Sequence, residues 1–354
     1  MPIPTEPIGS IPRPQALIDA VGAFSAGRIG RPALDAARET AVRETIARLE
    51  AAGSPVVSDG EQSKSSFATY PLEGMANLAP EGVVIPFADG HTRRLPVLTA
   101  GPFRYQVYAR TYLDQARRHA KVPMKQAVIA PSALSLLYPQ GGLAGYPREA
   151  FIADLADEAE KDIRLCLEGG AYCVQLDFTE GRLSLKLDPS GGVLREFLRI
   201  NNLVLERFSA AERARIGVHT CPGGDQDSTH SADVDYAGFL PSFFTLKAGA
   251  FYVELAGEED RKRVLRLIAE HLGKGRRAFV GVTDPISSRV ETAEEGRDQV
   301  LEAAAALGPE RLGSTDDCGF APFCDDLSTS RETAFAKVAA RVAGTQLASE
   351  RLKV

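Results

Sequence analysis

The sequence predicts an α/β protein, a (β/α)8 TIM barrel with a β-hairpin inserted between its second and third strands. Three observations favour this class. Eight short apolar runs rich in Val and Ile recur along the 354 residues, as expected for strands buried on both faces. Amphipathic helical stretches separate them, and several end at Gly. No Gly-x-Gly-x-x-Gly turn follows any run, which weighs against the alternative, an open doubly wound sheet.

The predicted elements alternate in order along the whole chain. The strands are expected at 7–10, 54–60, 124–130, 172–178, 216–220, 251–256, 278–284 and 311–317. The clearest helices are expected at 34–53, 149–170, 193–208, 259–273 and 293–308. No linker, internal repeat or low-complexity segment interrupts this alternation, so we expect residues 1–354 to form one catalytic domain.

Residues 82–98 break the alternation of strands and helices. The stretch reads as a β-hairpin with Asp89 and Gly90 at its turn, between the second and third predicted strands. In a barrel this position belongs to a loop at the catalytic face. The hairpin is either a flap over the site or a surface decoration.

The composition argues against some classes of binding partner. The chain carries 41 basic and 47 acidic residues, for a net charge of −6, and has no basic block. This argues against nucleic acid or an anionic membrane surface as a partner. No apolar run approaches the roughly 20 residues of a membrane span, and the first residues lack the pattern of a signal peptide. We therefore expect a cytoplasmic protein.

Five cysteines are too few and too scattered for a disulfide framework, so we expect reduced thiols. Cys166 lies on a predicted helix and Cys173 on a predicted strand, and both are interpreted as core thiols. The remaining cysteines lie at or beyond the ends of predicted strands, where some of them are free to bind a metal.

Four residues at the ends of three predicted strands suggest a metal site: His219, Cys221, Glu254 and Cys318. His219 and Cys221 are two residues apart on a strand, so their side chains face the same way. The strand ends of a barrel converge, and an imidazole, two thiolates and a carboxylate suit tetrahedral Zn²⁺. A buried carboxylate at position 254 needs a cation, either this metal or a Lys or Arg.

Seven short motifs occur in a fixed order: IGSIPRP (8–14), SDGEQ (58–62), QLDF (175–178), HTC (219–221), YVELA (252–256), GVTDP (281–285) and DDCGF (316–320). In this order they resemble the C-terminal catalytic half of cobalamin-independent methionine synthase and its shorter single-barrel relatives. The resemblance runs from Ile8 to about Phe335. It implies a zinc ion held by His219, Cys221, Glu254 and Cys318.

The resemblance also implies a homocysteine site. The backbone of Ile8, Gly9 and Ser10, together with Glu61, would bind the amino acid, and Asp177 would bind its ammonium group. Gly9 allows close approach to the backbone, and two carboxylates suit a substrate cation. Alternatively, Glu61 is a carboxylate at a helix N-terminus and Asp177 a helix cap or a partner in an internal salt bridge.

The chain departs from the family at the proton donor. The family carries a His after the seventh strand, whereas Ile286 stands there within residues 284–287. The acid role is then vacant or moved. Asp284 and His230 are the candidates, the latter in a polar loop at 222–236 that is expected to line the site. The alternative for His230 is a surface position.

The methyl donor is left open by two further departures. The family's full-length members have an additional N-terminal barrel and a Trp that contacts folate, and neither has a counterpart in this sequence, which contains no Trp. The donor is therefore a folate, a corrinoid or another alkyl compound. One branch of the short relatives opens epoxides with coenzyme M.

The predicted function is zinc-dependent methyl or alkyl transfer to a substrate thiol, in its most specific form methyl transfer to homocysteine. A corrinoid-dependent methyltransferase and an epoxyalkane–coenzyme M type alkyltransferase are alternatives in the same class. Hydrolysis is a different chemistry, disfavoured because two thiolate ligands make zinc a poorer Lewis acid. A small-molecule-binding barrel with structural zinc is a further alternative, although the usual C-x₂-C knuckles are absent.

Overall fold

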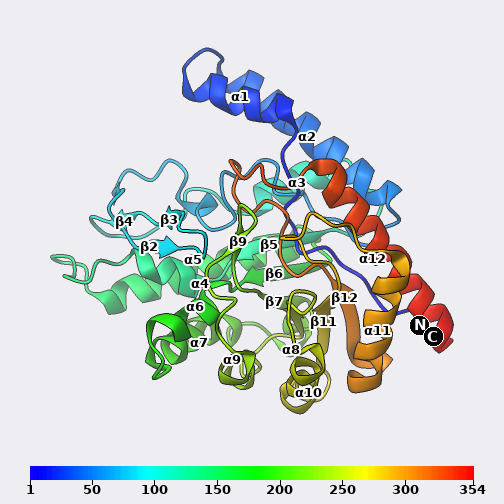
Figure 1. Ribbon diagram of the computed structural model, residues 1–354. Helices are drawn as coiled ribbons and strands as arrows, with labels where there is room; N and C mark the ends of the chain where they lie inside the picture. Colours follow the sequence, from blue (N-terminus) through cyan, green and yellow to red (C-terminus); the bar gives the residue numbers. More distant parts are fainter.

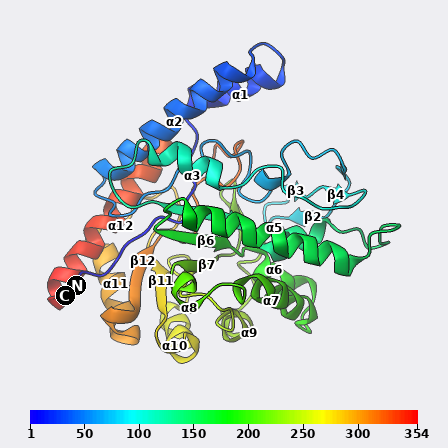
Figure 2. The same ribbon diagram turned by 180° about the vertical axis from the view of Figure 1, so that it is seen from behind.

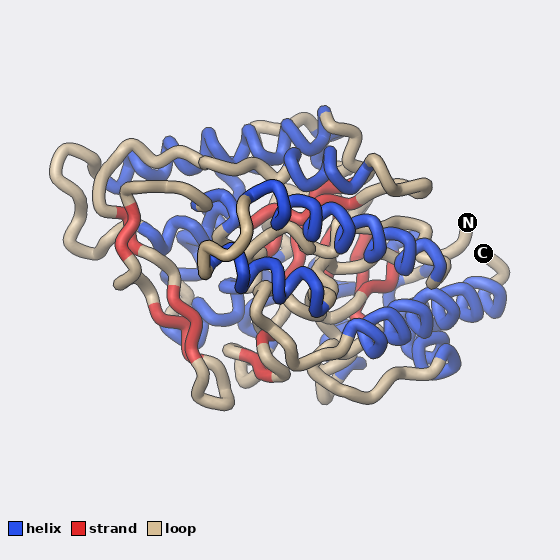
Figure 3. Tube along the Cα trace, turned by 90° about the horizontal axis from the view of Figure 1, so that it is seen from above, coloured by secondary structure: helices blue, strands red, loops and turns tan.

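Six parallel strands form the centre of the molecule in the computed structural model, which describes all residues 1–354 (Figures 1 and 3). Their spatial order is β12–β11–β10–β7–β6–β5. The strands are β5 (Lys125–Ile129), β6 (Cys173–Asp177), β7 (Ile216–Thr220), β10 (Ala250–Val253), β11 (Arg277–Gly281) and β12 (Leu312–Thr315). Nearly every residue in them is buried, which explains why the runs are rich in apolar residues and show no regular alternation with polar ones.

The prediction of regular strands is wrong for the first two segments. Residues 7–10 and 54–60 form no ladder, and single parallel bridges occur instead at Thr5 and Val57. Five prolines in the first fourteen residues explain the first case, because proline cannot donate to a ladder. Thr5 nevertheless pairs with β12 and Val57 with the residue before β5, so both segments flank the sheet where the barrel requires them.

Two hydrogen bonds join these flanking segments. The Ile11 amide donates to the Gly60 carbonyl over 3.0 Å, and the Ser58 hydroxyl donates to the Gly9 carbonyl over 2.8 Å. The eight segments thus follow one another in the predicted order, and the α/β class is confirmed. A continuous strand ladder between the first two segments is not formed.

Helices surround the strands (Figures 2 and 3). All five predicted helices are present: α2 (Arg31–Ala51), α5 (Arg148–Glu168), α7 (Gly192–Leu205), α10 (Arg261–His271) and α11 (Ala293–Leu307). The structure adds α1 (Gln15–Ser25), α3 (Arg110–Arg117), α6 (Glu180–Leu187), α9 (Tyr236–Phe243), α12 (Arg331–Leu352) and the short α4 (Pro131–Leu134) and α8 (Ala210–Arg213). Three 3₁₀ turns are η1 (Tyr70–Leu72), η2 (Ser135–Leu137) and η3 (Pro309–Arg311). None of the helices is long and apolar enough to cross a membrane.

The predicted hairpin is confirmed as β2 (Val84–Pro86) paired antiparallel with β3 (Thr92–Arg94). Gly90 adopts φ 95° at its turn, a conformation that favours glycine. Short flanking strands, β1 (Leu78–Ala79) and β4 (Val97–Leu98), pair at its base, and a second small hairpin joins β8 (Gly224–Asp225) to β9 (Ser228–Thr229). The Ala88 amide donates to the Thr229 carbonyl over 2.9 Å, so the two hairpins are in contact.

Candidate metal centre and substrate pocket

Three of the four predicted metal ligands meet at the C-terminal ends of the strands. His219 lies in β7, Cys221 follows that strand directly, and Cys318 follows β12. One ligand atom from each lies within 4.8 Å of the other two, and all three residues are buried. The two sulfur atoms are 3.1 Å apart. This is the convergence that the spacing and the barrel predicted.

The donor set fits a zinc ion. Both ring nitrogens of His219 are buried without a hydrogen-bond partner, an arrangement that costs free energy unless a ligand occupies the site. The hydrogen bond from Cys221 holds the pKa of the Cys318 thiol well below its ordinary value, whereas burial, together with that same contact, raises the pKa of Cys221. A thiolate beside a thiol and an unpartnered imidazole is the donor chemistry that Zn²⁺ selects.

Glu254, the fourth predicted ligand, lies outside this group of three. Its Oε2 accepts from the Tyr236 hydroxyl at 2.8 Å and pairs with Arg182 at 3.1 Å. Its backbone amide donates to the carbonyl of Thr220, the residue between His219 and Cys221. The side chain is therefore adjacent to the cluster but turned toward an arginine, which is the salt bridge the sequence left open.

Three residues that the sequence did not assign to the site stabilise the segments around it. Arg182, from α6, is buried and pairs with Glu254 and Glu258. Tyr236 is buried against the Arg182 guanidinium. Asp317 accepts from three successive amides after β10, at residues 255–257, over 2.7–2.8 Å. The last contact fixes the loop after β10 to the residue next to Cys318, and the DDC motif was its only signal in the sequence.

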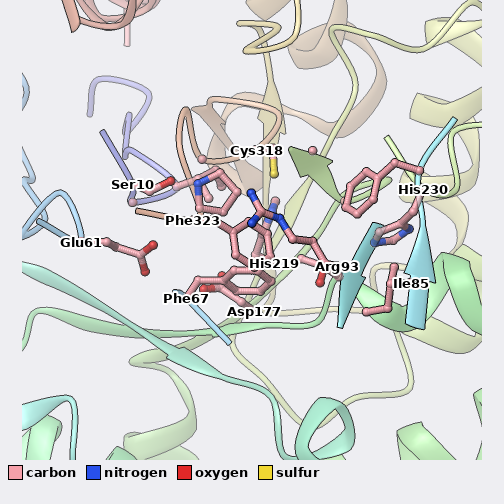
Figure 4. A pocket seen from close by; sticks show the side chains of 18 residues that line it. Ser10, Glu61, Phe67, Ile85, Arg93, Asp177, His219, His230, Cys318 and Phe323 are labelled. Carbon is pink, nitrogen blue, oxygen red and sulfur yellow. The ribbon is translucent and has the colours of Figure 1, made fainter. Parts of the chain in front are cut away.

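A pocket of about 580 Å³, with the solvent at its mouth included, opens beside the cluster (Figure 4). It brings together eight of the predicted site residues, which are Ile8, Gly9, Ser10, Glu61, Asp177, His219, His230 and Cys318. Ser10 and Glu61 lie on one side of the view and His230 on the other, with His219 and Cys318 between them. Residues from six segments of the chain thus share one cavity at the end where barrel enzymes carry out their chemistry.

The acidic part of the pocket contains two buried carboxylates. Glu61 is held in a left-handed turn, φ 55°, and its Oε1 pairs with the buried Lys64 ammonium at 3.0 Å. Asp177 accepts from the Gln175 amide at 2.7 Å and has no cationic side chain bonded to it. Burial raises the pKa of Asp177 to about 7, and the nearby Glu61 carboxylate adds to the rise. A bound ammonium group would supply the missing positive charge.

The backbone at residues 8–10 faces the same cavity. A Cβ at Gly9 would make only ordinary van der Waals contacts, with Ala127 at 3.9 Å and Glu61 at 4.0 Å, so this backbone is not tightly covered by protein atoms. The Ser10 hydroxyl accepts from the Ala321 amide at 3.2 Å and lies against Gly319. The first segment is therefore anchored to the loop that carries Cys318.

His230 reaches the pocket, whereas Asp284 does not line it. The His230 ring bonds the Ser231 hydroxyl through Nδ1 at 2.9 Å, and burial lowers its pKa to about 3. A ring with this pKa is neutral at neutral pH and carries no imidazolium proton to donate. The Asp284 carboxylate instead accepts from the Ile286 amide at 2.9 Å, and the Ile286 side chain points toward Gly224, which also faces Cys318.

The other wall of the pocket is apolar and includes the β2–β3 hairpin. Ile85, Phe87 and Arg93 of the hairpin line the cavity together with Phe67 and Phe323. This position supports the flap interpretation over the surface decoration.

Arg93 holds the hairpin in place. Its guanidinium pairs with Asp225 at 2.5 Å and Asp325 at 2.9 Å, and it lies 4.1 Å from the centre of the Phe323 ring. No sequence signal identified Arg93, because its partners are more than a hundred residues away.

The chain matches the family model for the catalytic domain of cobalamin-independent synthases over residues 3–341. It therefore belongs to this family. Among curated proteins it is similar to the methionine synthase of Saccharolobus solfataricus, with 24% identity covering 99% of this chain and 96% of that protein. It is also 24% identical to the methionine synthase of Pyrococcus furiosus, covering 90% of this chain and 86% of that protein.

Solved structures share the fold. A B12-independent methionine synthase from Shewanella sp. W3-18-1, in complex with selenomethionine, superposes with a TM-score of 0.78 at 19% identity, covering 100% of this chain and 99% of that one. A putative vitamin-B12-independent methionine synthase from Listeria monocytogenes gives 0.72 at 18% identity, with 97% of each chain covered. The barrel-like architecture is thus common to these proteins.

Proposed function

We propose that this protein transfers a methyl group to the thiol of homocysteine, forming methionine, in a zinc-dependent reaction. The observation that carries the proposal is the position of the buried cluster of His219, Cys221 and Cys318. It lies at the floor of a pocket whose wall presents Glu61 and Asp177. A thiol-binding site and a cation-binding site in one cavity suit an amino acid with a thiol side chain.

His219, Cys221 and Cys318 would hold the metal, with Glu254 as a fourth, displaceable ligand. Zinc bound by such residues lowers the pKa of a substrate thiol, so that the thiolate is available at neutral pH. Glu254 is suited to a ligand that leaves, because Arg182 and Tyr236 already bond its Oε2. The arginine would stabilise the carboxylate whenever it is displaced.

The chain's own residues would orient the substrate. Asp177 and Glu61 would bind the ammonium group, and the backbone of Ile8, Gly9 and Ser10 would contact the rest of the amino acid. The hairpin residues on the opposite wall would exclude water from the thiolate, which strengthens its nucleophilicity. This arrangement places the attacking atom between the acidic wall and the apolar wall.

The lack of a proton donor in the pocket favours a methyl donor whose leaving group departs without taking up a proton. Ile286 occupies the position at which the family's proton donor is expected, and burial keeps the His230 ring neutral. A methylcorrinoid meets this condition, because its cobalt leaves with the electron pair of the broken bond. A methylated folate needs a proton on its departing nitrogen, so we rank it second.

We also infer that residues 1–354 act as one domain. A single cluster of 72 buried apolar residues extends from Ile3 to Ala348. Both ends of the chain contribute to it, since the Ile3 amide donates to the Ser349 hydroxyl over 3.0 Å. Limited proteolysis that yields one resistant core of nearly full length would support this inference, and two independently stable fragments would contradict it.

The test combines spectroscopy with turnover. X-ray absorption at the zinc edge, with and without L-homocysteine, should show one additional sulfur ligand when the amino acid is present. Methionine formation should then be measured with methylcobalamin and with a methylated folate. An unchanged zinc shell would exclude homocysteine as the acceptor and favour a structural metal. Added sulfur without methionine from either donor would direct the search to other alkyl donors.

A further inference from the structure

A second depression opens at the opposite end of the barrel, where the strands begin. Its lining includes the residues at or just before the starts of β6, β7, β10, β11 and β12, among them Tyr172, Arg215, Ala250, Arg277 and Arg311. It measures about 1310 Å³, with the solvent at its mouth included. The pocket beside the metal cluster lies at the other ends of the same strands, so the barrel interior lies between the two cavities.

The charge of this depression is unusual for the chain. Its lining contains five basic side chains and two carboxylates, in a protein whose net charge is −6. The basic residues are Arg215, Lys274, Arg276, Arg277 and Arg311. None of the five forms an ion pair with any carboxylate of the chain, although arginines elsewhere in the molecule commonly do.

The two carboxylates do not neutralise these cations. Glu6 accepts from the Tyr252 hydroxyl at 2.5 Å and lies 3.6 Å from the buried Lys125 ammonium, so its charge is already balanced. Glu310 is exposed at the rim and contributes only its backbone carbonyl, which accepts from Arg277 over 3.5 Å. The depression therefore retains an excess of positive charge.

The arginines also retain free hydrogen-bond donors. Arg277 and Arg311 each donate to one backbone carbonyl, and the Nε atom of each is buried without a partner. Each guanidinium carries five N–H donors, so most of these donors remain unused. Arg276 donates to the Phe244 carbonyl over 2.6 Å, and burial alone lowers its pKa, since no carboxylate lies near enough to oppose the change. Unused, partly buried donors of one charge indicate an anionic ligand.

We propose that this depression binds a small molecule that carries a chain of phosphate groups. Guanidinium groups match phosphate oxygens in charge and geometry, and five cationic side chains around one depression exceed what a single phosphate needs. A concave depression suits a small ligand better than the extended backbone of a nucleic acid. The exposed Tyr172 side chain at the rim offers a face on which a nucleotide base could stack.

Calorimetric titration of the full-length protein tests the proposal with two probes, ATP and inorganic tripolyphosphate, without magnesium and at constant ionic strength. We expect saturable binding with one site per chain for at least one probe. Tighter binding of ATP that is lost in Tyr172→Ala would identify a nucleotide. Equal binding of both probes, unaffected by that change, would identify the phosphate chain alone as the ligand.

Two double variants distinguish a specific binding site from general electrostatic attraction. Lys274→Ala/Arg277→Ala removes two charges from the lining and should weaken binding about tenfold or more, as expected for lost charge-assisted hydrogen bonds. The matched control, Arg28→Ala/Arg43→Ala, removes two exposed charges that also lack ion pairs but lie on the α1–α2 segment. It should leave the affinity within about twofold, which is the range of a purely long-range effect.

Three results would overturn the proposal: no saturable binding of either probe up to millimolar concentration, equal weakening in the two double variants, or binding of single-stranded nucleic acid without binding of tripolyphosphate. Because Lys274 makes no side-chain hydrogen bond, Lys274→Glu alone provides a variant that preserves the fold and should still weaken binding. The inference does not depend on the methyl-transfer proposal, since it concerns the other end of the barrel and is read by binding alone.

Discussion

The candidate metal cluster of His219, Cys221 and Cys318 differs from a second polar cluster, formed by Glu6, Lys125 and Tyr252, in what its polar atoms contact. In the second cluster the Tyr252 hydroxyl donates to Glu6, and the Lys125 ammonium lies 3.6 Å from that carboxylate and 3.8 Å from the centre of the Tyr252 ring. In the candidate metal cluster, both ring nitrogens of His219 lack a hydrogen-bond partner. The Lys125 ammonium makes no hydrogen bond either, but it has a carboxylate and an aromatic ring within 4 Å. The second cluster therefore contains its own counter-charge and is called closed, whereas the candidate metal cluster is open to a ligand.

Two cysteines at opposite ends of the barrel interior show the same contrast. Burial raises the pKa of Cys173 to about 12, and its sulfur lies within hydrogen-bonding distance of the Val174 carbonyl and the Tyr252 hydroxyl. The pKa of Cys318 is instead lowered, chiefly by the hydrogen bond from Cys221. Burial alone therefore does not make a reactive thiol. A second donor within contact distance decides whether the sulfur can ligate a metal.

The largest expected effect separates these two cysteines. Cys318→Ala should reduce bound zinc from about one ion per chain to background and abolish methyl transfer, because the three ligands that remain include only one thiolate and a displaceable carboxylate. Cys173→Ala should retain both metal and activity. Zinc stoichiometry by mass spectrometry and a methionine assay provide the readouts. If Cys173→Ala loses zinc while Cys318→Ala keeps it, the assignment of the metal site is wrong.

Breaking the closed cluster should affect stability rather than metal content. Lys125→Met leaves the Glu6 carboxylate buried without its cation and should cost about 3–5 kcal/mol of unfolding free energy. The double variant Glu6→Gln/Lys125→Met removes both charges and should recover most of that loss. Urea denaturation measures both values. A single variant as stable as the unaltered protein would show that this ion pair contributes nothing to the closed cluster.

A carboxylate near the catalytic end should make stability depend on pH. Glu180 is buried, its only side-chain partner is the Ser132 hydroxyl, and burial raises its pKa to about 8 from 4.5. The folded protein then holds this proton more tightly than the unfolded chain between these two values. Stability should consequently fall as the pH rises from about 4.5 to about 8.

Glu180→Gln tests this because an amide cannot ionise. The variant should match the unaltered protein near pH 4 and exceed it by about 3 kcal/mol near pH 7, given about 1.4 kcal/mol per pKa unit. Denaturation curves at several pH values give the difference. Parallel pH profiles of the two proteins would show that Glu180 is not the titrating group.

The sequence predicted the six central strands and the proximity of His219, Cys221 and Cys318, for physical reasons. Buried parallel strands are rich in apolar residues, and His219 and Cys221 share a face by their spacing alone. The partner of Glu254 was not predictable, because Arg182 comes from a helix that the sequence did not reveal. Long-range ion pairs leave no local pattern, so the sequence established only that Glu254 required some cation.

Helix α12 was not predicted from the sequence for a similar reason. Its buried face includes Lys337, which pairs with Glu291 at 3.0 Å, and Arg341, which pairs with Asp316 at 2.9 Å. Charged residues at buried positions interrupt the apolar period by which an amphipathic helix is recognised. The error in the first predicted strand comes from proline, whose effect on pairing outweighed the apolar pattern.

The smallest predicted effect concerns the open cluster's neighbour, Asp177. Asp177→Asn keeps the size of the side chain and its bond from Gln175 but removes the charge that would face a substrate ammonium. We expect the KM for homocysteine to rise about 10- to 100-fold with zinc content unchanged, since a lost charge-assisted hydrogen bond is worth about 1.5–3 kcal/mol.

A substrate analogue provides the control. 4-Mercaptobutyrate has the thiol and the carboxylate of homocysteine but no ammonium group, so the unaltered protein and Asp177→Asn should use it equally poorly. If Asp177→Asn is impaired equally with both thiols, Asp177 acts on the cluster rather than on the substrate. A variant impaired only with homocysteine would place the ammonium group at Asp177, and would thereby show that the pocket above the open cluster is selective for amino acids.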